Sequence, residues 1–134
     1  MTLPPEEKNV EELGGTMILG NRRINIVKGT IAHAVYGTTE ITERHRHRYE
    51  INPKFFKDLN EKGGLVFSAW RVDVPRVEII ELPHHYFFVA TQFHPEFRSR
   101  PLRPHPLFVA LLNAAYRRKH GLPSPYSVNT TVYA

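Results

Sequence analysis

Phe93-His94-Pro95-Glu96-Phe97 is the stretch on which the interpretation of this 134-residue chain depends. A strand-like run from Tyr86 to Phe93 ends abruptly here at a histidine, a proline and a carboxylate. An open α/β sheet can present a histidine base and its orienting acid in this way, and such a base normally serves a serine or cysteine nucleophile. The chain contains no cysteine. The sequence therefore suggests an enzyme, and only part of one.

Length and composition indicate an ordinary globular domain. A chain of 134 residues can bury roughly two thirds of its unfolded surface, and 41% hydrophobic residues argue against wholesale disorder. No window approaches the ~20 apolar residues of a membrane span and no secretory pattern follows Met1, so we expect a cytoplasmic protein. The absence of cysteine excludes disulfides and thiolate metal sites. The net charge of +5 suits anionic ligands but is weak evidence for any of them.

Three regions are predicted along the chain. Residues 1–13 combine prolines and acids with few apolar anchors, which is typical of an N-terminal arm or loop. Residues 14–121 contain the strand and helix patterns and form the folded part. Residues 122–134 are rich in Pro, Ser and Thr and are expected to form a flexible C-terminal tail.

Within the folded part, strand patterns and helix signals follow one another. Three helices are predicted: Ile31–Tyr36 before Gly37, a helix from Asn52-Pro53 to Gly63, and a long helix from His105-Pro106 to Gly121. The long helix carries one apolar stripe, made of Leu107, Phe108, Leu111, Leu112 and Ala115. Strands are predicted at 16–20, 24–27, 43–51, 65–72, 77–82 and 86–93.

The order of these elements is unusual for a whole α/β domain. Such a domain normally begins with a buried strand followed by a ligand-binding turn, whereas this chain begins with an arm. Its second half is rich in strands joined by proline-containing turns, which favours an antiparallel meander attached to a larger sheet. The pattern predicts the second half of an α/β fold.

His94 and Glu96 are the first candidate site. They lie two positions apart around a proline, and residues two apart in an extended segment point to the same side. Glu96 can then accept a hydrogen bond from one ring nitrogen of His94, while the other nitrogen faces a nucleophile. The alternative is a capped strand end with a surface histidine, and the motif alone does not decide between them.

The run from Arg44 to Glu50, RHRHRYE, is the second candidate site. In an extended strand its three arginines share one face and His45, His47 and Tyr49 share the other. Arginine suits bidentate recognition of a carboxylate, and a solvated basic edge is the alternative. A nucleic-acid ribbon is disfavoured because aromatic residues are not interleaved with the basic ones. The two histidines could join His94 and Glu96 in a zinc site, but H-x-H alone is a weak signal, and we predict no metal ligands.

Four stretches together resemble the CTP synthase family, in the C-terminal part of its class I (triad) glutamine amidotransferase domain. The resemblance extends from about Gly14 to Ala115, and the string ERHRHRYE is its most specific element. The stretches are Gly14-Gly15-Thr16-Met17, Glu43 to Asn52 (ERHRHRYEIN), Val77 to Glu81 (VEIIE) and Gln92 to Phe97 (QFHPEF).

This resemblance implies a fold and a role for each matching residue. The fold is that of a class I glutaminase: α/β and flavodoxin-like, with a mostly parallel sheet flanked by helices and a small antiparallel extension. His94 corresponds to the catalytic base and Glu96 to the acid that orients it. Arg48 corresponds to the arginine that holds the α-carboxylate of glutamine.

The resemblance also implies an activity that needs more than this chain. In the family, glutamine is hydrolysed through a cysteinyl thioester, and the ammonia passes to an N-terminal synthetase domain that aminates UTP to CTP with ATP and magnesium. The family enzymes are homo-tetramers. The nucleophile lies in an upstream G-x-C-x-G turn that this chain lacks, so the chain alone is expected to be inactive and to hold no cofactor. Ile18 stands where the family usually has arginine.

Two other classes of function stay open at this point. One is a stand-alone, non-catalytic module that binds glutamine through Arg48 or regulates a partner, and calorimetry with glutamine would detect it. The other is a basic nucleic-acid-binding or metal-binding protein built on Arg44 to Arg48. Steep salt dependence of DNA retention would identify the nucleic-acid binder.

Overall fold

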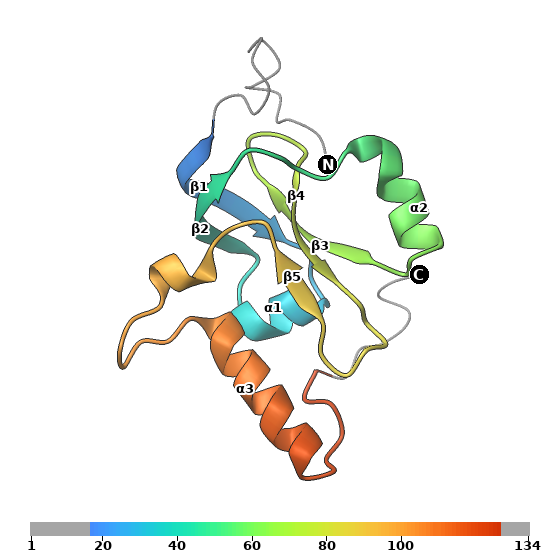
Figure 1. Cartoon of the computed structure of the whole chain (residues 1–134), viewed down its shortest axis with the longest axis vertical. Coiled ribbons are helices and arrows are strands. Elements are labelled where there is room, and N and C mark those ends of the chain that lie inside the picture. Colours follow the sequence, from blue (N-terminus) through green and yellow to red (C-terminus); the bar gives the residue numbers. More distant parts are fainter. Residues whose placement is uncertain (1–16, 127–134) are drawn as a thin grey trace.

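The computed structural model describes residues 17–126 and shows one twisted sheet with helices around it (Figure 1). The predicted arm, residues 1–13, and residues 127–134 of the predicted tail lie outside this range. The five strands lie in the order β2-β1-β3-β4-β5. Their bounds are Ile18–Ile26 for β1, Glu40–His47 for β2, Val66–Arg71 for β3, Val77–Glu81 for β4 and Val89–Thr91 for β5.

Every neighbouring pair of strands among residues 17–126 is antiparallel. The prediction of an α/β chain holds, but the mostly parallel sheet predicted for it is not found in this part, and the antiparallel portion is larger than expected. The connections explain the difference. Residues 72–76 join β3 to β4 and residues 82–88 join β4 to β5. Both connections are too short for the crossover that parallel neighbours require, which takes a dozen or more residues.

β1 and β2 form the longest ladder of the sheet. They are paired from Ile18 with His47 to Asn25 with Glu40. The two strands predicted at 16–20 and 24–27 are therefore one strand. Gly20 has a φ of 78°, in the region that glycine adopts at little cost, and the ladder continues in register through it.

The sheet curls, which brings β2 close to β4. Two strands separate them in the sheet order, so in a flat sheet they would lie about 14 Å apart at the usual spacing. Instead, His45 on β2 and Glu78 on β4 are in hydrogen-bond contact at 2.7 Å. Residues from opposite parts of the sheet therefore meet inside the curl.

The predicted helix at Ile31–Tyr36 is confirmed as α1. Thr30 caps its beginning, because the hydroxyl oxygen accepts from the His33 amide at 3.2 Å, and Gly37 ends it with a φ of 71°. The carboxylate of Glu81 on β4 accepts from the first two amides of the helix, at 2.8 and 3.1 Å. These two hydrogen bonds fasten the first turn of α1 to the end of β4.

The predicted helix after Asn52 is a 3₁₀ turn, η2 (Pro53–Phe55), that continues into α2 (Phe56–Glu61). Asn52 begins it as predicted, and its side chain accepts from the amide of Lys54 at 3.0 Å. Phe56 packs its ring against two aromatic residues of β3, Phe67 and Trp70.

The long helix α3 (Pro106–Lys119) begins and ends where the sequence predicts, but another face of it is buried. Its buried residues are Leu107, Ala110 and Ala114. Of the predicted stripe only Leu107 is buried; Ala115 is exposed, and so are Phe108 by 38%, Leu111 by 54% and Leu112 by 72%. The hydrophobic core lies between the sheet, α1 and α3, and consists of Ile24, Ile26, Ala32, Ala69, Ile79, Phe93 and Leu107.

The beginning of the predicted tail lies against the loop after β4. The hydroxyl of Tyr86 donates to the carbonyl of Leu122 at 2.9 Å, and Ser124 donates to the carbonyl of Tyr86 at 2.7 Å. Within residues 17–126, no helix has the length and apolar character needed to cross a membrane.

Candidate active site

His94 and Glu96 lie at the point where β5 gives way to the 3₁₀ turn η3 (Pro95–Arg98). His94 is extended, with φ −108° and ψ 93°, and Pro95 begins the turn, so the two side chains come to the same side. Nδ1 of His94 lies 2.5 Å from Oε1 of Glu96. The pairing of base and acid predicted from the sequence is therefore present as a direct contact.

The His94 ring is positioned by three further contacts. Its backbone amide donates to the carbonyl of Arg44 at 3.0 Å. Its ring stacks on Phe97 with centroids 4.8 Å apart and 14° between the planes. Its second nitrogen, Nε2, lies 3.2 Å from the carbonyl oxygen of Arg46. The imidazole, 35% exposed, is thus held at the end of β2 with its Nε2 side toward the chain that leads to Arg48.

The electrostatics of the pair favour the tautomer that a base needs. The hydrogen bond from His94 lowers the pKa of the Glu96 carboxyl, so Glu96 is a carboxylate at neutral pH and can only accept. Nδ1 of His94 must then carry the proton. Nε2 faces the Arg46 carbonyl, which can only accept, so it presents a lone pair, as in the histidine of a catalytic triad, only when the ring is neutral and turned from that carbonyl.

Arg48 follows the last residue of β2 and is exposed. The segment around it is held on both sides. The side chain of Gln92 donates to the carbonyl of Tyr49 at 2.8 Å. The buried carboxylate of Glu50 pairs with Arg71 at 3.2 Å and Arg76 at 2.8 Å. The structure therefore brings the backbone that carries Arg48 beside the backbone that carries His94.

The histidines of the ERHRHRYE run lie on the face of β2 opposite the arginines, as predicted. Arg44 and Arg46 are exposed, whereas His45 is 2% exposed. Burial lowers the pKa of His47 to about 4, because the charged ring would lose its water. Burial also raises the pKa of Glu78, while its hydrogen bond with His45 opposes that rise.

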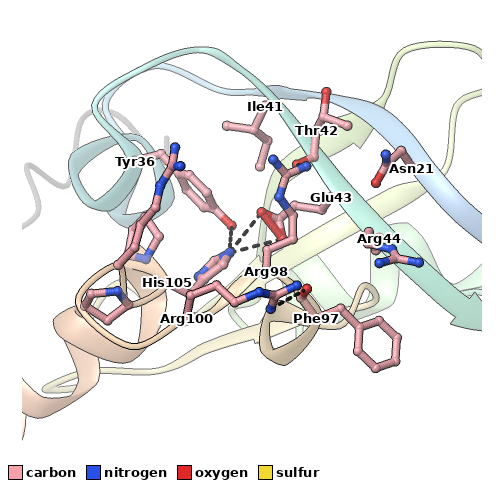
Figure 2. A pocket seen from close by; sticks show the side chains of 13 residues that line it. Asn21, Tyr36, Ile41, Thr42, Glu43, Arg44, Phe97, Arg98, Arg100 and His105 are labelled. Atoms are coloured by element: carbon pink, nitrogen blue, oxygen red, sulfur yellow. Dashed lines mark hydrogen bonds and ion pairs between the residues drawn. The ribbon is translucent and has the colours of Figure 1, made fainter.

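Figure 2 shows a second polar site, which the sequence analysis missed. It is an open cavity of about 650 Å³, and four arginines line it, Arg44, Arg98, Arg100 and Arg103. The spacing of the arginines after Glu96, RSRPLR, gave no sign of a cavity. Their guanidinium groups make the site suitable for anions.

Behind this cavity, a buried histidine joins α3 to β2 and α1. Nδ1 of His105 accepts from the amide of Leu107 at 3.1 Å, so Nε2 carries the proton and donates to the Glu43 carboxylate at 2.9 Å. The hydroxyl of Tyr36 lies 3.4 Å from the same nitrogen (Figure 2). Burial, and then the charge of Glu43, raise the pKa of Tyr36, so its hydroxyl stays protonated.

The profile of the family described as "Glutamine amidotransferase class-I" matches residues 5–114 of the chain. The chain belongs to this family. The match spans most of the chain and contains both candidate sites. It confirms the class I glutaminase resemblance that the HPEF and ERHRHRYE stretches indicated.

Relatives of the chain include CTP synthases from archaea and bacteria. The chain is 67% identical to the CTP synthase of Caldivirga maquilingensis over 125 residues, covering 93% of this chain and 23% of that protein. It is 59% identical to the CTP synthase of Pyrobaculum aerophilum over 113 residues, covering 84% and 21%. The chain therefore spans less than a quarter of the length of these curated relatives.

A solved structure supports the same fold. The glutaminase domain of Trypanosoma brucei CTPS with bound acivicin superposes with a TM-score of 0.76 at 36% identity, covering 95% of this chain and 48% of that one. The class I glutaminase fold expected for this chain is confirmed.

The structure also gives a reason for Ile18, where the resemblance led us to expect arginine. Ile18 is 1% exposed and begins β1, opposite His47 in the ladder. In this chain the position is a buried apolar contact.

Proposed function

We propose that this chain is the C-terminal part of the glutaminase half of a CTP synthase. The observation that carries the proposal is the 2.5 Å contact between His94 Nδ1 and Glu96 Oε1 in a chain of the class-I amidotransferase family. The 67% identity with the Caldivirga enzyme supports the choice of CTP synthase among the enzymes of that family.

In the proposed reaction, His94 is the base and Glu96 orients it. Glu96 keeps the proton of the ring on Nδ1, so Nε2 is free to take the thiol proton of a cysteine from the upstream part of the domain. For this step Nε2 turns from the carbonyl of Arg46 toward the thiol. The same nitrogen later returns the proton to the departing ammonia.

Arg48 is proposed to hold the α-carboxylate of glutamine. A guanidinium binds a carboxylate through two parallel hydrogen bonds, which fixes both the position and the orientation of the substrate. The exposure of Arg48 and its place beside the His94 segment support this role.

The remaining steps belong to the rest of the proposed enzyme. Ammonia passes to the N-terminal synthetase domain, which uses ATP and Mg²⁺ to aminate UTP, and none of those sites is assigned to residues of this chain. The whole enzyme is proposed to be a cytoplasmic homo-tetramer that assembles mainly through the synthetase domain.

The test is to change His94 in the whole enzyme. In the His94→Ala variant we expect ammonia release from glutamine to fall at least about a thousandfold, because the base is lost. CTP formation from added ammonia should be retained, since that step does not use the base. His84→Ala, in an exposed turn, is the matched control and should retain both activities. Equal loss of both activities in His94→Ala would contradict the assignment.

A second variant tests Arg48 in the same enzyme. Lysine keeps the charge of arginine but cannot form the bidentate pair, and a charge-assisted hydrogen bond is worth about 1.5–3 kcal/mol. Arg48→Lys is therefore expected to raise the KM for glutamine by about 10- to 100-fold, with a smaller change in kcat. Arg46→Lys, on the exposed face of β2, is the control. An unchanged KM in Arg48→Lys would remove Arg48 from the substrate site.

A further inference from the structure

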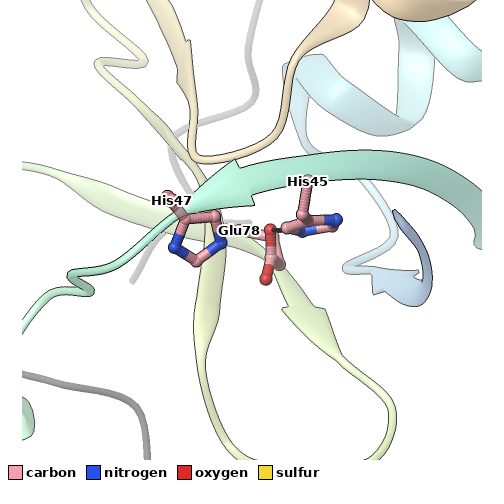
Figure 3. A group of neighbouring side chains, drawn as sticks. All are labelled: His45, His47 and Glu78. Carbon is pink, nitrogen blue, oxygen red and sulfur yellow. Dashed lines mark hydrogen bonds and ion pairs between the residues drawn. The ribbon is translucent and has the colours of Figure 1, made fainter. Parts of the chain in front are cut away.

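Two neighbouring histidines on β2 and one glutamate on β4 converge inside the curl of the sheet, as Figure 3 shows. One possible ligand atom from each of His45, His47 and Glu78 can be chosen so that all three lie within 4.8 Å of one another. The side chains of His45 and Glu78 are fully buried. The proposed glutaminase chemistry uses none of the three residues.

Two polar atoms of this cluster are left without a partner. Nε2 of His47 and Oε1 of Glu78 are buried, and neither has a hydrogen bond within the described part of the chain. Buried polar groups in proteins are nearly always satisfied, so each such atom calls for an explanation. Both of these atoms belong to the same three-residue cluster.

The hydrogen bonds of the rings fix which nitrogen carries the proton. Nδ1 of His45 lies 3.1 Å from the carbonyl oxygen of Glu43, and Nδ1 of His47 lies 3.1 Å from the carbonyl oxygen of Tyr49. Carbonyl oxygens only accept, so both rings carry their proton on Nδ1 and present a lone pair at Nε2. A backbone carbonyl on the far nitrogen is how proteins orient metal-binding histidines.

Glu78 completes a donor set that metal ions prefer. Its Oε2 lies 2.7 Å from Nε2 of His45, so two acceptors face each other unless a proton or a cation lies between them. Two imidazoles and one carboxylate, with room for a water molecule, are a ligand set that proteins use for Zn²⁺. The set also suits other divalent transition metals, Co²⁺ among them.

The spacing suits a zinc ion after a small adjustment. Tetrahedral Zn²⁺ with bonds of about 2.0–2.2 Å holds its ligand atoms about 3.3–3.6 Å apart. To bind the ion, Nε2 of His45 and Oε2 of Glu78 would move apart from their present 2.7 Å. The other distances between ligand atoms, none above 4.8 Å, would shorten. A small cavity of about 60 Å³ lies against Glu78, with Thr91 and Gln92 among its lining residues.

We propose that His45 Nε2, His47 Nε2 and the Glu78 carboxylate bind one Zn²⁺ ion that fastens the end of β2 to β4. The ion takes the place of the proton between His45 and Glu78, and that proton passes to solvent. Because His47 directly precedes Arg48, the ion steadies the segment proposed to bind glutamine. This site replaces the expectation from the sequence that the chain has no metal ligands.

The test is a metal titration of the full-length protein, including any upstream segment that its gene encodes. The protein is freed of metal with EDTA and titrated with Zn²⁺ in a calorimeter, and separately with Co²⁺ while its visible absorption is followed. We expect a Zn²⁺ ion to bind with a Kd below about 1 µM, since structural zinc sites bind tightly. The Co²⁺ complex should show the absorption of a four-coordinate ion. A wild-type protein that binds no Zn²⁺ in this range overturns the proposal.

Variants of His47 and Glu78 test whether the bound ion lies at this cluster. His47→Gln is the main variant, because His47 is only partly buried and its loss should leave the fold intact, as circular dichroism would verify. We expect it to bind one Zn²⁺ fewer, or to bind that ion more than about 100-fold more weakly, since even changing a group that only orients a metal ligand costs about 10- to 100-fold. Glu78→Gln should show the same loss.

The matched control is His84→Gln, which removes an exposed imidazole elsewhere. It should bind Zn²⁺ as the wild type does. If His47→Gln binds the same number of ions with the same affinity as this control, the zinc lies elsewhere and the proposal is wrong. The glutaminase assignment is unaffected by that result, because it is measured by His94→Ala.

Discussion

At the scale of single residues, the buried guanidinium of Arg71 is neutralised in part by a carboxylate that is half exposed to solvent. The guanidinium of Arg71 is almost fully buried and binds two carboxylates, Glu50 at 3.2 Å and Asp73 at 2.7 Å. The hydrogen bond from Arg71 lowers the pKa of Asp73 below its usual 3.8. An acid whose pKa is lower in the folded state stabilises the fold above its unfolded pKa. That contribution is lost as the pH falls through the folded pKa.

We therefore expect Asp73→Asn to cost about 1 kcal/mol in the free energy of unfolding at pH 7, because the carboxylate is half exposed and screened. The difference from wild type should shrink as the pH falls below 3.8, since Asp73 is then protonated first in the unfolded chain and, at still lower pH, in the folded chain as well. Urea unfolding at pH 7 and pH 3 measures it. Asp58→Asn, which removes an exposed pair with Lys62, should change stability by less at pH 7. A difference for Asp73→Asn that is as large at pH 3 as at pH 7 would refute the argument.

At the scale of one element, α3 has two apolar faces with different surroundings. Leu107 is 8% exposed and belongs to the core, whereas Leu112 is 72% exposed. Removing the side chain of Leu107 leaves a cavity, so Leu107→Ala should cost about 2–5 kcal/mol of stability. Leu112→Ala should change it by no more than about 0.5 kcal/mol. Thermal or urea unfolding of the two variants compares them within one helix. Equal costs would mean that the exposed face of α3 is covered in solution.

The same helix shows what a sequence pattern can and cannot predict. His105, Pro106 and Gly121 mark its two ends because capping is a local interaction of a few neighbouring residues. Which of its apolar faces is buried depends on what packs against it, and the pattern of Leu111 and Leu112 carries no information about that. The helix packs against α1, and such a tertiary contact cannot be predicted from the spacing of residues within α3.

The candidate sites likewise include contacts that are local in sequence and contacts that are not. His94 and Glu96 are two residues apart, so local geometry was sufficient to predict their contact. Glu78 meets His45 across 33 positions of sequence, and only the curl of the sheet brings them together. Whether two paired strands run parallel or antiparallel is also decided by contacts between distant residues. For that reason the antiparallel sheet of this chain differs from the mostly parallel sheet that was predicted.

At the scale of the whole molecule, the chain offers the histidine proposed as base and the arginine proposed to bind glutamine, but no thiol in its 134 residues. A histidine without a nucleophile cannot form the thioester through which we propose glutamine is hydrolysed. We therefore expect the 134-residue chain, purified by itself, to release no more ammonia from glutamine than its His94→Ala variant. A coupled glutamate dehydrogenase assay measures this release.

Completion of the site in trans is the positive counterpart of this experiment. The exposed apolar residues of α3, Phe108, Leu111 and Leu112 among them, offer a surface that an upstream segment of the domain could cover. Mixing the chain with a separately made upstream segment that carries the G-x-C-x-G turn should then restore measurable glutaminase activity. Replacing Leu112 by Glu should reduce that activity without unfolding the chain, since the side chain is exposed. Ammonia release by the unmixed chain above the His94→Ala level would show that another group serves as nucleophile, and the thioester route would have to be abandoned for this protein.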